Sequence, residues 1–571
     1  MEMRRTLLIV AMAVVGYFLL ITWQRDHGPQ AQPAAVAGAS APVATTEVPA
    51  APVVTAEVPA APAAAASDVP AAPQNADTAA VPTVPDSSGK RISVKTDVLD
   101  VQIDLTGGDL VRVALPGYTE AVESPKPFVL LDNSASRTFV AQSGLIGQNG
   151  PDAAAGGRPL YQAGAASYVL GEGDKTLTVA LSLPPQNGVS VRKVYEFTRG
   201  DYLVKVRYEI ANAGTAPWKG LMFGQLKRDN SKDPSQSTQG LGMSTFLGAA
   251  WWSPEKSYNK TALSDLAEEP LKLSATGGWI ALVQHYFVTA WVPDAQAANH
   301  YVTRVNSQTG ENFLAFTGQE VAVAPGQSAK VGAALYVGPK IQDKLEKISD
   351  GLELTVDYGW LWFIAQFLFW LLQKIHGVVG NWGWAIVILT IMVKAAFFQL
   401  SATSYKSMAH LRRVTPELQR IREVHGNDRQ KMSQAMMELY KKEKINPLGG
   451  CLPILVQMPV FIALYWTLME SVELRHAGWI LWINDLSMMD PYFVLPILMT
   501  LSMVAQTALN PAPQDPMQAK VMKLMPWVFG IMFLWFPAGL VLYWVVNNLL
   551  SIAQQWVITR QIEKGEIKRV G

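Results

Sequence analysis

The chain has 571 residues, and 47 lysines and arginines face 46 aspartates and glutamates, a formal net charge of +1. This balance leaves no whole-chain electrostatic footprint for nucleic acid, so we expect no direct nucleic-acid partner. The length allows two or three domains. The single cysteine, Cys451, excludes an intrachain disulfide, and its apolar neighbours favour a buried, inert thiol over a reactive one.

Residues 6–23 form an uncharged apolar run directly after Arg4 and Arg5. The run is near the minimum length of a membrane-spanning helix, and the preceding positive charges favour a cytoplasmic N-terminus. A cleaved signal peptide is the alternative, but no small-residue cleavage pattern directly follows the run. We therefore predict a retained N-terminal transmembrane anchor over 1–23. An Ala/Pro-rich periplasmic linker over 24–90 follows, extended because dense proline blocks helix and sheet.

Residues 91–340 show the strand-like alternation of apolar and polar positions, with turn signals between the runs. Residues 191–198 and 202–210 flank Arg199-Gly200-Asp201, which predicts a hairpin. Many strands and few helical stretches predict a large antiparallel β-sandwich. His285 lies in a strand-like run, where a packed or surface histidine is commoner than a metal ligand.

Two apolar blocks, 360–372 and 382–400, come after a helix-like stretch over 341–354. If both blocks crossed a membrane, residues 401–447 would lie outside, yet they contain ten lysines and arginines against five acidic residues. Such an excess is typical of a cytoplasmic loop. We therefore predict that only the second block crosses, while the first, rich in aromatic residues, lies in the outer membrane interface.

The remaining apolar runs predict three more spans, so that the α-helical part has five transmembrane helices with the anchor included and both termini in the cytoplasm. The three spans lie at about 448–468, 489–509 and 527–548. The predicted organisation is a periplasmic part over 24–380, a linker helix and interfacial helix over 341–380, a helical core over 381–560, and a basic cytoplasmic tail over 561–571.

Residues 402–444 repeat apolar positions at helical spacing on both sides of Gly426-Asn427-Asp428. This pattern predicts a cytoplasmic hairpin of two amphipathic helices, although a solvated loop is the alternative. A basic hairpin of this kind could meet anionic lipid, a ribosome or a targeting factor, and the sequence does not choose among them.

Lys394 lies within the second predicted span, after an uncharged run over 375–393. An ammonium at the centre of a membrane helix costs about 2.5–3.5 kcal/mol on insertion scales. One explanation is that the lysine stem snorkels toward the inner end of the span, about 9 Å away. The other is a water-filled cavity open toward the cytoplasm, which the ammonium would line.

Several polar residues of the predicted spans fall at helical spacing. Thr390 lies one turn before Lys394, Gln457 interrupts the third span, and Tyr543 lies four residues before Asn547. Each alone fits a hydrogen bond between helices, which is the commoner role. Together with an intramembrane cation they favour the cavity, which could receive a polar or acidic segment part-way into the bilayer.

Four segments resemble the YidC family of bacterial membrane protein insertases. They read GNWGWAIVILTIMVK at 380–394, NPLGGCLPILVQMPVFIALY at 446–465, DPMQ at 515–518 and LWFPAGLVLYW at 534–544. The resemblance covers roughly residues 350–560, and the outer domain resembles the Gram-negative form more loosely. It implies insertion and folding of nascent inner-membrane proteins, alone or with the Sec translocon. It also implies a five-span core, a periplasmic β-supersandwich and a hydrophilic groove open to the cytoplasm and lipid.

This sequence departs from the family at two groove positions. The family usually has an arginine where Lys394 stands, so the charge is preserved while the planar guanidinium is lost. Its paired tyrosines resemble Tyr543 and Trp544, so one hydroxyl is lost. The groove residues that we expect are Lys394, Thr390, Gln457, Tyr543, Trp544 and Asn547.

The chain shows no nucleotide-binding loop, zinc motif or nucleophile triad, so we expect a non-enzymatic protein without a cofactor. A secondary transporter or channel is the first alternative, against which the spans show no internal repeat and only one charge. A membrane-anchored scaffold is the second. For the insertase, the expected partners are nascent membrane proteins, Sec components, membrane lipids, and possible ribosome or targeting-factor contacts through 402–444 and the tail.

Overall fold

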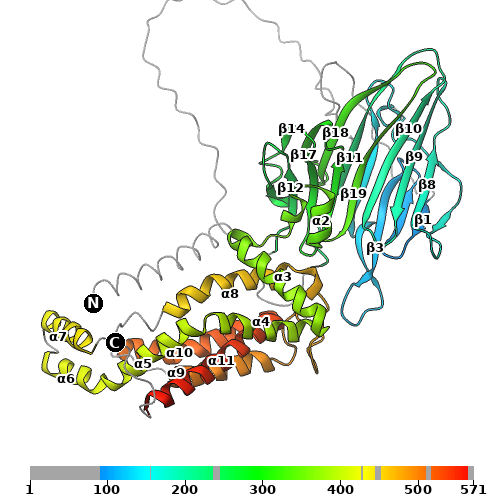
Figure 1. Ribbon diagram of the computed structural model, residues 1–571. Coiled ribbons are helices and arrows are strands. Elements are labelled where there is room, and N and C mark those ends of the chain that lie inside the picture. The colour runs from blue at the N-terminus through cyan, green and yellow to red at the C-terminus, as the bar shows by residue number, and fades with distance from the viewer. Residues whose placement is uncertain are drawn as a thin grey trace, which may run out of the picture. The chain divides into compact units, whose positions relative to one another are not determined.

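The computed structural model describes residues 91–154, 156–235, 245–425, 428–443, 452–509 and 516–563. Strands occupy the described chain up to Pro339, and helices dominate after it (Figure 1). The predicted anchor over 1–23, the predicted linker over 24–90, Cys451 and residues 564–571 of the predicted tail lie outside the described residues.

The strands form two sheets whose described pairings are antiparallel, apart from β1 with β7. The ten-stranded sheet has the order β14-β17-β18-β11-β5-β4-β3-β2-β1-β7, and the nine-stranded sheet β13-β12-β15-β16-β19-β10-β9-β8-β6. The strands are β1 (Arg91–Lys95), β2 (Asp100–Asp104), β3 (Asp109–Thr119), β4 (Pro127–Ser134), β5 (Arg137–Ile146), β6 (Gln162–Ala163), β7 (Ser167–Val169), β8 (Thr176–Ser182), β9 (Val189–Thr198), β10 (Leu203–Asn212), β11 (Trp218–Arg228), β12 (Gly248–Trp252), β13 (Asn259–Ala262), β14 (Lys272–Thr276), β15 (Trp279–Val283), β16 (Phe287–Pro293), β17 (Ala298–Val305), β18 (Asn312–Val323) and β19 (Ser328–Pro339).

The core of this β domain lies between the two sheets, because alternate residues of each strand turn inward. In β10, for example, Val204, Val206 and Tyr208 are buried. Aromatic rings from both sheets meet in the core: Phe128 and Phe287 stack with centroids 4.3 Å apart. The predicted antiparallel sandwich is confirmed.

The predicted hairpin around Arg199-Gly200-Asp201 is also confirmed, since β9 and β10 pair antiparallel across it. Gly200 has a φ of 73°, the left-handed conformation that glycine adopts without strain. The prediction that His285 lies in a strand is wrong, because this residue is in the turn between β15 and β16. Its ring is packed, as predicted, with Nε2 2.9 Å from the Met469 carbonyl oxygen.

The predicted helical stretch over 341–354 is wrong in extent. Helix α2 covers only Gln342–Ile348, and Gly351, with a φ of 75°, starts the short 3-10 helix Leu352–Thr355. A second 3-10 turn, Gly359–Leu361, leads into α3 (Trp362–Val379), which ends at Gly380 with a φ of 71°. The other 3-10 turns are Pro151–Ala153, Leu263–Asp265 and Val472–Leu474.

Six further helices complete this part of the chain: α4 (Trp382–Ala396), α5 (Phe398–Arg413), α8 (Leu452–Glu470), α9 (Val494–Leu509), α10 (Pro516–Phe533) and α11 (Ala538–Glu563). Among the described residues, Gly359–Val379 is the one unbroken helix long and apolar enough to cross a membrane by length and composition. The pair α4 and α5 passes the same test only together, and it is bent by 65°.

Two predicted spans are therefore wrong in outline. The span over 382–400 is not one helix, because the chain bends between Ala396 and Phe398; the apolar sequence across the bend contains no turn signal. The span over 527–548 is two helices, α10 and α11, separated at 534–537. Hydropathy did not mark this turn because it is apolar, but Pro537 ends helical continuity. The split also corrects the predicted topology of five spans with both termini in the cytoplasm, because an odd number of crossings cannot leave both termini on one side.

Residues 415–442 form a separate compact pair of helices, α6 (Thr415–His425) and α7 (Arg429–Lys442). Asp428 caps α7 by accepting hydrogen bonds from the backbone N–H groups of Gln430 and Lys431. Leu418 and Leu439 are buried, as an amphipathic pair requires. The predicted hairpin over 402–444 starts too early, because residues 402–413 belong to α5.

Candidate functional site

Lys394 is buried among helices, with 9 % of its surface exposed. Its Nζ donates a hydrogen bond to Ser551 Oγ on α11, over 2.7 Å. Ser551 in turn donates to the backbone carbonyl oxygen of Asn547, also over 2.7 Å. The ammonium therefore ends against a neighbouring helix, in contact with the polar stripe of α11.

The surroundings of Lys394 are unusually poor in acceptors. An ammonium has three hydrogen-bond donors, and in the described part of the chain Ser551 is the partner that the amine contacts. No described carboxylate forms an ion pair with it. Because a buried cation without sufficient acceptors is costly, the other donors require water or an incoming acceptor.

Helix α11 presents four polar side chains at intervals of four residues: Tyr543, Asn547, Ser551 and Gln555. They lie on one face, since four residues make about one turn. Sequence reasoning found the first two and missed the others, because the predicted span ended at 548 whereas α11 continues to Glu563. Continuing the same spacing would have found Ser551, the direct partner of Lys394.

The other predicted groove residues make different contacts. Gln457 on α8 donates to Ser401 Oγ on α5 over 3.5 Å, a long hydrogen bond. The Thr390 hydroxyl donates to the carbonyl oxygen of Ile386 in its own helix, so it does not join Lys394. The structure thus joins Lys394 to Ser551, whose hydroxyl bonds to the backbone of Asn547 and not to its side chain, and it connects Gln457 to a separate serine.

Tyr543 and Trp544 belong to an aromatic cluster of α8, α10 and α11. The ring of Tyr543 stacks on Phe461 with centroids 6.1 Å apart. Trp544 meets Phe461 and Phe533 edge-on, at 4.8 and 5.5 Å. Within the described residues the buried indole nitrogen of Trp544 has no hydrogen-bond partner, so this side chain contributes bulk to the site rather than a polar contact.

Hydrogen bonds at the helix ends show which ends of the helices lie together. At one end, Asn381 before α4 donates to the Trp479 carbonyl oxygen over 3.2 Å. The N–H of Ala538, the first residue of α11, donates to the Met488 carbonyl oxygen over 2.7 Å at the same loop. At the other end, Gln555 donates to the carbonyl oxygen of Leu509, the last residue of α9. We call residues 471–493 the outer loop, because the predicted topology puts this segment on the outer side of the membrane.

The β domain contacts the outer-loop end of the helices. Lys340 Nζ lies 2.8 Å from Glu470 Oε2 at the end of α8, and both side chains are buried. Arg475 in the outer loop donates to the Thr119 carbonyl oxygen of β3 over 2.8 Å. The hydrophilic contacts around Lys394 and Ser551 therefore lie away from the β domain, toward the opposite end.

Comparison with known proteins identifies the chain. A family profile described as the YidC periplasmic domain matches residues 91–371, and one described as 60Kd inner membrane protein matches residues 374–565. These descriptions assign the β domain to the periplasm and the helices to the inner membrane, as predicted. A solved structure titled as an active YidC insertase aligns with 82% of this chain and 92% of its own, but a TM-score of 0.35 at 16% identity adds no argument.

Relatives match over almost the full length of the chain. The membrane protein insertase YidC of Stutzerimonas stutzeri is 54% identical and covers 99% of both chains. That of Pseudomonas fluorescens is 54% identical over 100% of both, and that of Pseudomonas syringae pv. syringae 54% identical over 99% of both. The chain belongs to the YidC family of membrane protein insertases.

Proposed function

We propose that this chain inserts newly made membrane proteins by receiving their polar or acidic segments in a hydrated site centred on Lys394. The observation that carries this proposal is the buried ammonium with one neutral partner, Ser551. An incoming carboxylate supplies the missing acceptors and charge. The substrate's apolar segment then faces a shorter barrier and partitions into lipid between the helices, so no covalent step or cofactor is needed.

Thr390, Gln457, Tyr543, Trp544 and Asn547 are proposed to line or support the same site. Gln457 contributes its side-chain amide from α8, within reach of Ser401, and Asn547 contributes the backbone carbonyl oxygen that accepts from Ser551. Tyr543 and Trp544 form its aromatic side, where an apolar substrate segment can pack. Since Lys394 is a point charge without a planar fork, a general electrostatic attraction fits better than bidentate recognition.

The proposed topology has five crossings in the described part of the chain. They are the bent pair α4–α5, then α8, α9, α10 and α11. With the outer loop at the periplasmic side, α11 ends in the cytoplasm. The predicted anchor adds a sixth crossing, which leaves both termini in the cytoplasm. The basic α6–α7 pair then follows α5 on the inner side, in agreement with its charge.

Helix α3 is proposed to lie in the outer interface although its length would allow it to cross. Its exposed aromatic residues suit the headgroup region: Trp362, Phe363, Phe367 and Trp370 are each more than half exposed. A crossing by both α3 and α4–α5 would put the basic residues of α6 and α7 outside. We further propose contacts with the Sec translocon, and with ribosomes or targeting factors through α6, α7 and the basic tail.

Site-specific crosslinking tests the insertase proposal against a transporter or a scaffold. A photoreactive residue at Gln457 or Tyr543 is expected to capture ribosome-bound nascent membrane proteins. The matched control is Glu320, exposed on β18 of the β domain, which should capture none. A scaffold or a small-solute transporter would capture no nascent chain at either helical position. That result would overturn the proposal.

A further inference from the structure

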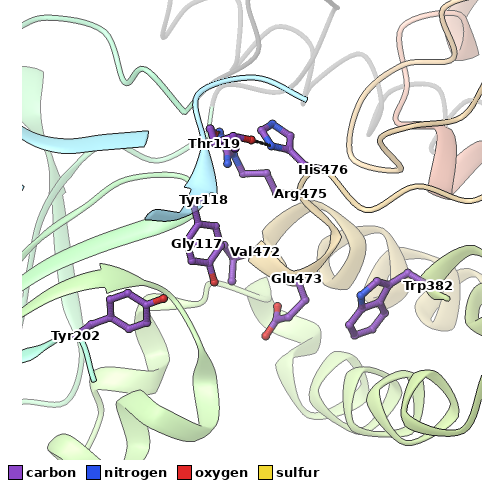
Figure 2. Close-up of a pocket in the computed structure, with 9 residues that line it drawn as sticks. All are labelled: Gly117, Tyr118, Thr119, Tyr202, Trp382, Val472, Glu473, Arg475 and His476. Atoms are coloured by element: carbon purple, nitrogen blue, oxygen red, sulfur yellow. Dashed lines mark hydrogen bonds between the residues drawn. The ribbon is translucent and has the colours of Figure 1, made fainter. Parts of the chain in front are cut away.

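A cavity of about 510 Å³ lies where the β domain meets the outer loop and the start of α4. Figure 2 shows side chains from these three elements facing one space. The lining residues are Gly117, Tyr118, Thr119, Tyr202, Trp382, Val472, Glu473, Arg475 and His476. The size is that of a small-molecule site, and the cavity is separate from the site around Lys394.

Glu473 gives the cavity an anionic group without a cation. Its carboxylate forms no ion pair with any described lysine or arginine. The charged side chain that acts on it electrostatically, Asp343 of α2, is itself acidic. Three aromatic side chains, Tyr118, Tyr202 and Trp382, line the same cavity. A carboxylate beside electron-rich rings is the environment that an ammonium group prefers.

Arg475 gives the cavity its positive charge. Its Nη2 donates to the Thr119 carbonyl oxygen over 2.8 Å, and its guanidinium lies over the Phe128 ring at 5.3 Å. It has no carboxylate within ion-pair distance among the described residues, and its own contacts fix it in place. Guanidinium groups bind phosphate oxygens well.

His476 adds no charge at neutral pH. Its Nδ1 lies 2.9 Å from the Thr119 hydroxyl. Burial, together with the neighbouring Arg475, lowers the pKa of the imidazole to about 4. The cavity therefore presents one carboxylate and one guanidinium, unpaired with each other, to a ligand that has both charges.

The place of the cavity in the fold narrows the class of ligand further. Trp382 is the first residue of α4, so the cavity lies at the level where the proposed crossing leaves the outer leaflet. We infer that the cavity binds the ethanolamine–phosphate headgroup of an outer-leaflet phospholipid, with the ammonium at Glu473 and the rings and the phosphate at Arg475. This placement rests on the topology proposed above.

The affinity of the cavity for the headgroup should depend on pH. Burial raises the pKa of the Glu473 carboxyl to about 7, so protonation removes the anion as the pH falls below neutrality. The other titratable or charged groups that face Glu473 are Asp343 of α2, Tyr118 of β3, Tyr336 of β19, Tyr358 before the 3-10 turn, Arg475 and His476. Headgroup affinity is therefore expected to fall between pH 8 and pH 6.

The test uses the full chain, purified in detergent and freed of lipid, with lipid binding measured by native mass spectrometry. Phosphatidylethanolamine and phosphatidylglycerol with identical acyl chains are compared at pH 8. The first is expected to bind at least tenfold more tightly, because the second has the phosphate without the ammonium. Glu473→Gln should remove this preference. The matched control is Glu353→Gln, a partly buried carboxyl of raised pKa outside the cavity, which should leave the preference unchanged.

Two further measurements complete the test. One asks whether the cavity recognises the whole headgroup or only its phosphate, and the other uses a variant that keeps both charged residues. Soluble phosphoethanolamine should displace the bound lipid, whereas inorganic phosphate at the same concentration should not. Trp382→Leu, which keeps both charges, should weaken phosphatidylethanolamine binding several-fold. Equal binding of the two lipids by the wild type, an unchanged preference in Glu473→Gln, or equal competition by phosphate would each overturn the inference.

The outcome is separable from that of the insertase proposal. Lys394→Glu is expected to insert substrates with acidic tails less efficiently while keeping the lipid preference. Glu473→Gln is expected to lose the preference with a folded helical region. A wild type that prefers phosphatidylethanolamine but fails the nascent-chain crosslinking would refute the function alone. A wild type that crosslinks but shows no lipid preference would refute this inference alone.

Discussion

Lys193 in the β domain and Lys394 in the helical region are both buried, but their surroundings differ. Lys193 is fully buried, and its Nζ donates to the carbonyl oxygens of Gly107 and Ser143 over 2.9 and 3.0 Å. Asp109 lies 3.9 Å from it. Among the described residues, Lys394 donates a hydrogen bond to Ser551 alone. A buried cation whose acceptors are supplied by the fold is a structural element, whereas one that lacks them is poised to accept a partner.

The β-domain lysine is part of a closed network of charges. Arg158 bonds to Asp109 over 2.7 Å and to Asp152 over 2.8 Å. Burial lowers the pKa of Lys193 to about 7, because its own acceptors only partly offset the lost hydration. Lys193 and Arg158 therefore face two carboxylates inside the sandwich. The network fixes the turn between β2 and β3 instead.

The largest effect is expected from removing the structural cation. Lys193→Met leaves Asp109 with one cation, Arg158, and removes two buried hydrogen bonds, so that the Gly107 and Ser143 carbonyl oxygens keep only Arg158 as donor. The variant should destabilise the β domain by about 3–5 kcal/mol. Hydrogen exchange of β3 and β9 in the full chain measures this loss. Lys205→Met on the neighbouring β10, where an exposed ion pair with Glu196 is removed, is the control and should cost under about 1 kcal/mol. Equal protection in both variants would contradict the structural role.

The next effect concerns function rather than stability. Lys394→Glu should reduce insertion of substrates with acidic outward tails about tenfold, which corresponds to about 1.4 kcal/mol, with a smaller effect on neutral tails. Insertion into vesicles, scored by protease protection of the tail, measures both substrate classes. Lys520→Glu on α10 makes the same charge change on an exposed lysine and should be neutral. The same loss for acidic and neutral tails would remove Lys394 from the mechanism.

A third variant tests the one contact of Lys394. Ser551→Ala removes the acceptor, and we expect a reduction in insertion of about two- to fivefold, the value of one hydrogen bond to a charged group that water partly replaces. Ser502→Ala removes a comparable buried serine contact, the hydrogen bond from Asn548, without touching Lys394. If both serine variants insert the acidic substrate equally well, Ser551 does not position the amine.

The smallest effect on insertion is expected from Lys394→Arg, and the same substitution at Lys193 tests the comparison most directly. Lys394→Arg keeps the charge in a site that the proposal leaves open to water, so insertion should stay within about twofold of wild type. Lys193→Arg adds bulk to a closed site and should cost about 1–3 kcal/mol of β-domain stability. Insertion assays and hydrogen exchange on both variants check this, and a reversed order would refute the distinction between the two lysines.

Much of the architecture was predictable from local sequence. Alternating polarity and turn residues such as Gly200 specify strands and hairpins, and an intramembrane charge such as Lys394 is visible in any apolar run. The turn at Pro537 and the bend before Phe398 were not predictable from hydropathy, because the residues at both positions are apolar. The turn at 534–537 is apolar and therefore has the same composition as the helices that it separates.

The site itself was predicted only in part. Lys394 was identified by its charge, and the structure joins it to Ser551, a residue that lay beyond the predicted end of the span. Asn547 meets Ser551 only through its backbone carbonyl oxygen, so its side chain stays a prediction. Thr390 has the right spacing, but its hydroxyl bonds to its own helix. Spacing specifies which face of a helix a residue occupies, and it does not specify which atom of another helix will meet it.

The sequence by itself determined which part of the chain suits water and which suits the bilayer, the strand and helix periods, and the lysine within the second predicted span. Only the tertiary structure decided where helices end within apolar sequence, that Ser551 meets Lys394, and that β3, the outer loop and α4 line one open cavity with Glu473 and Arg475. The reason is that periodicity and charge are properties of neighbouring residues along the chain. Contacts between α4 and α11, some 157 positions apart, depend on how the helices pack.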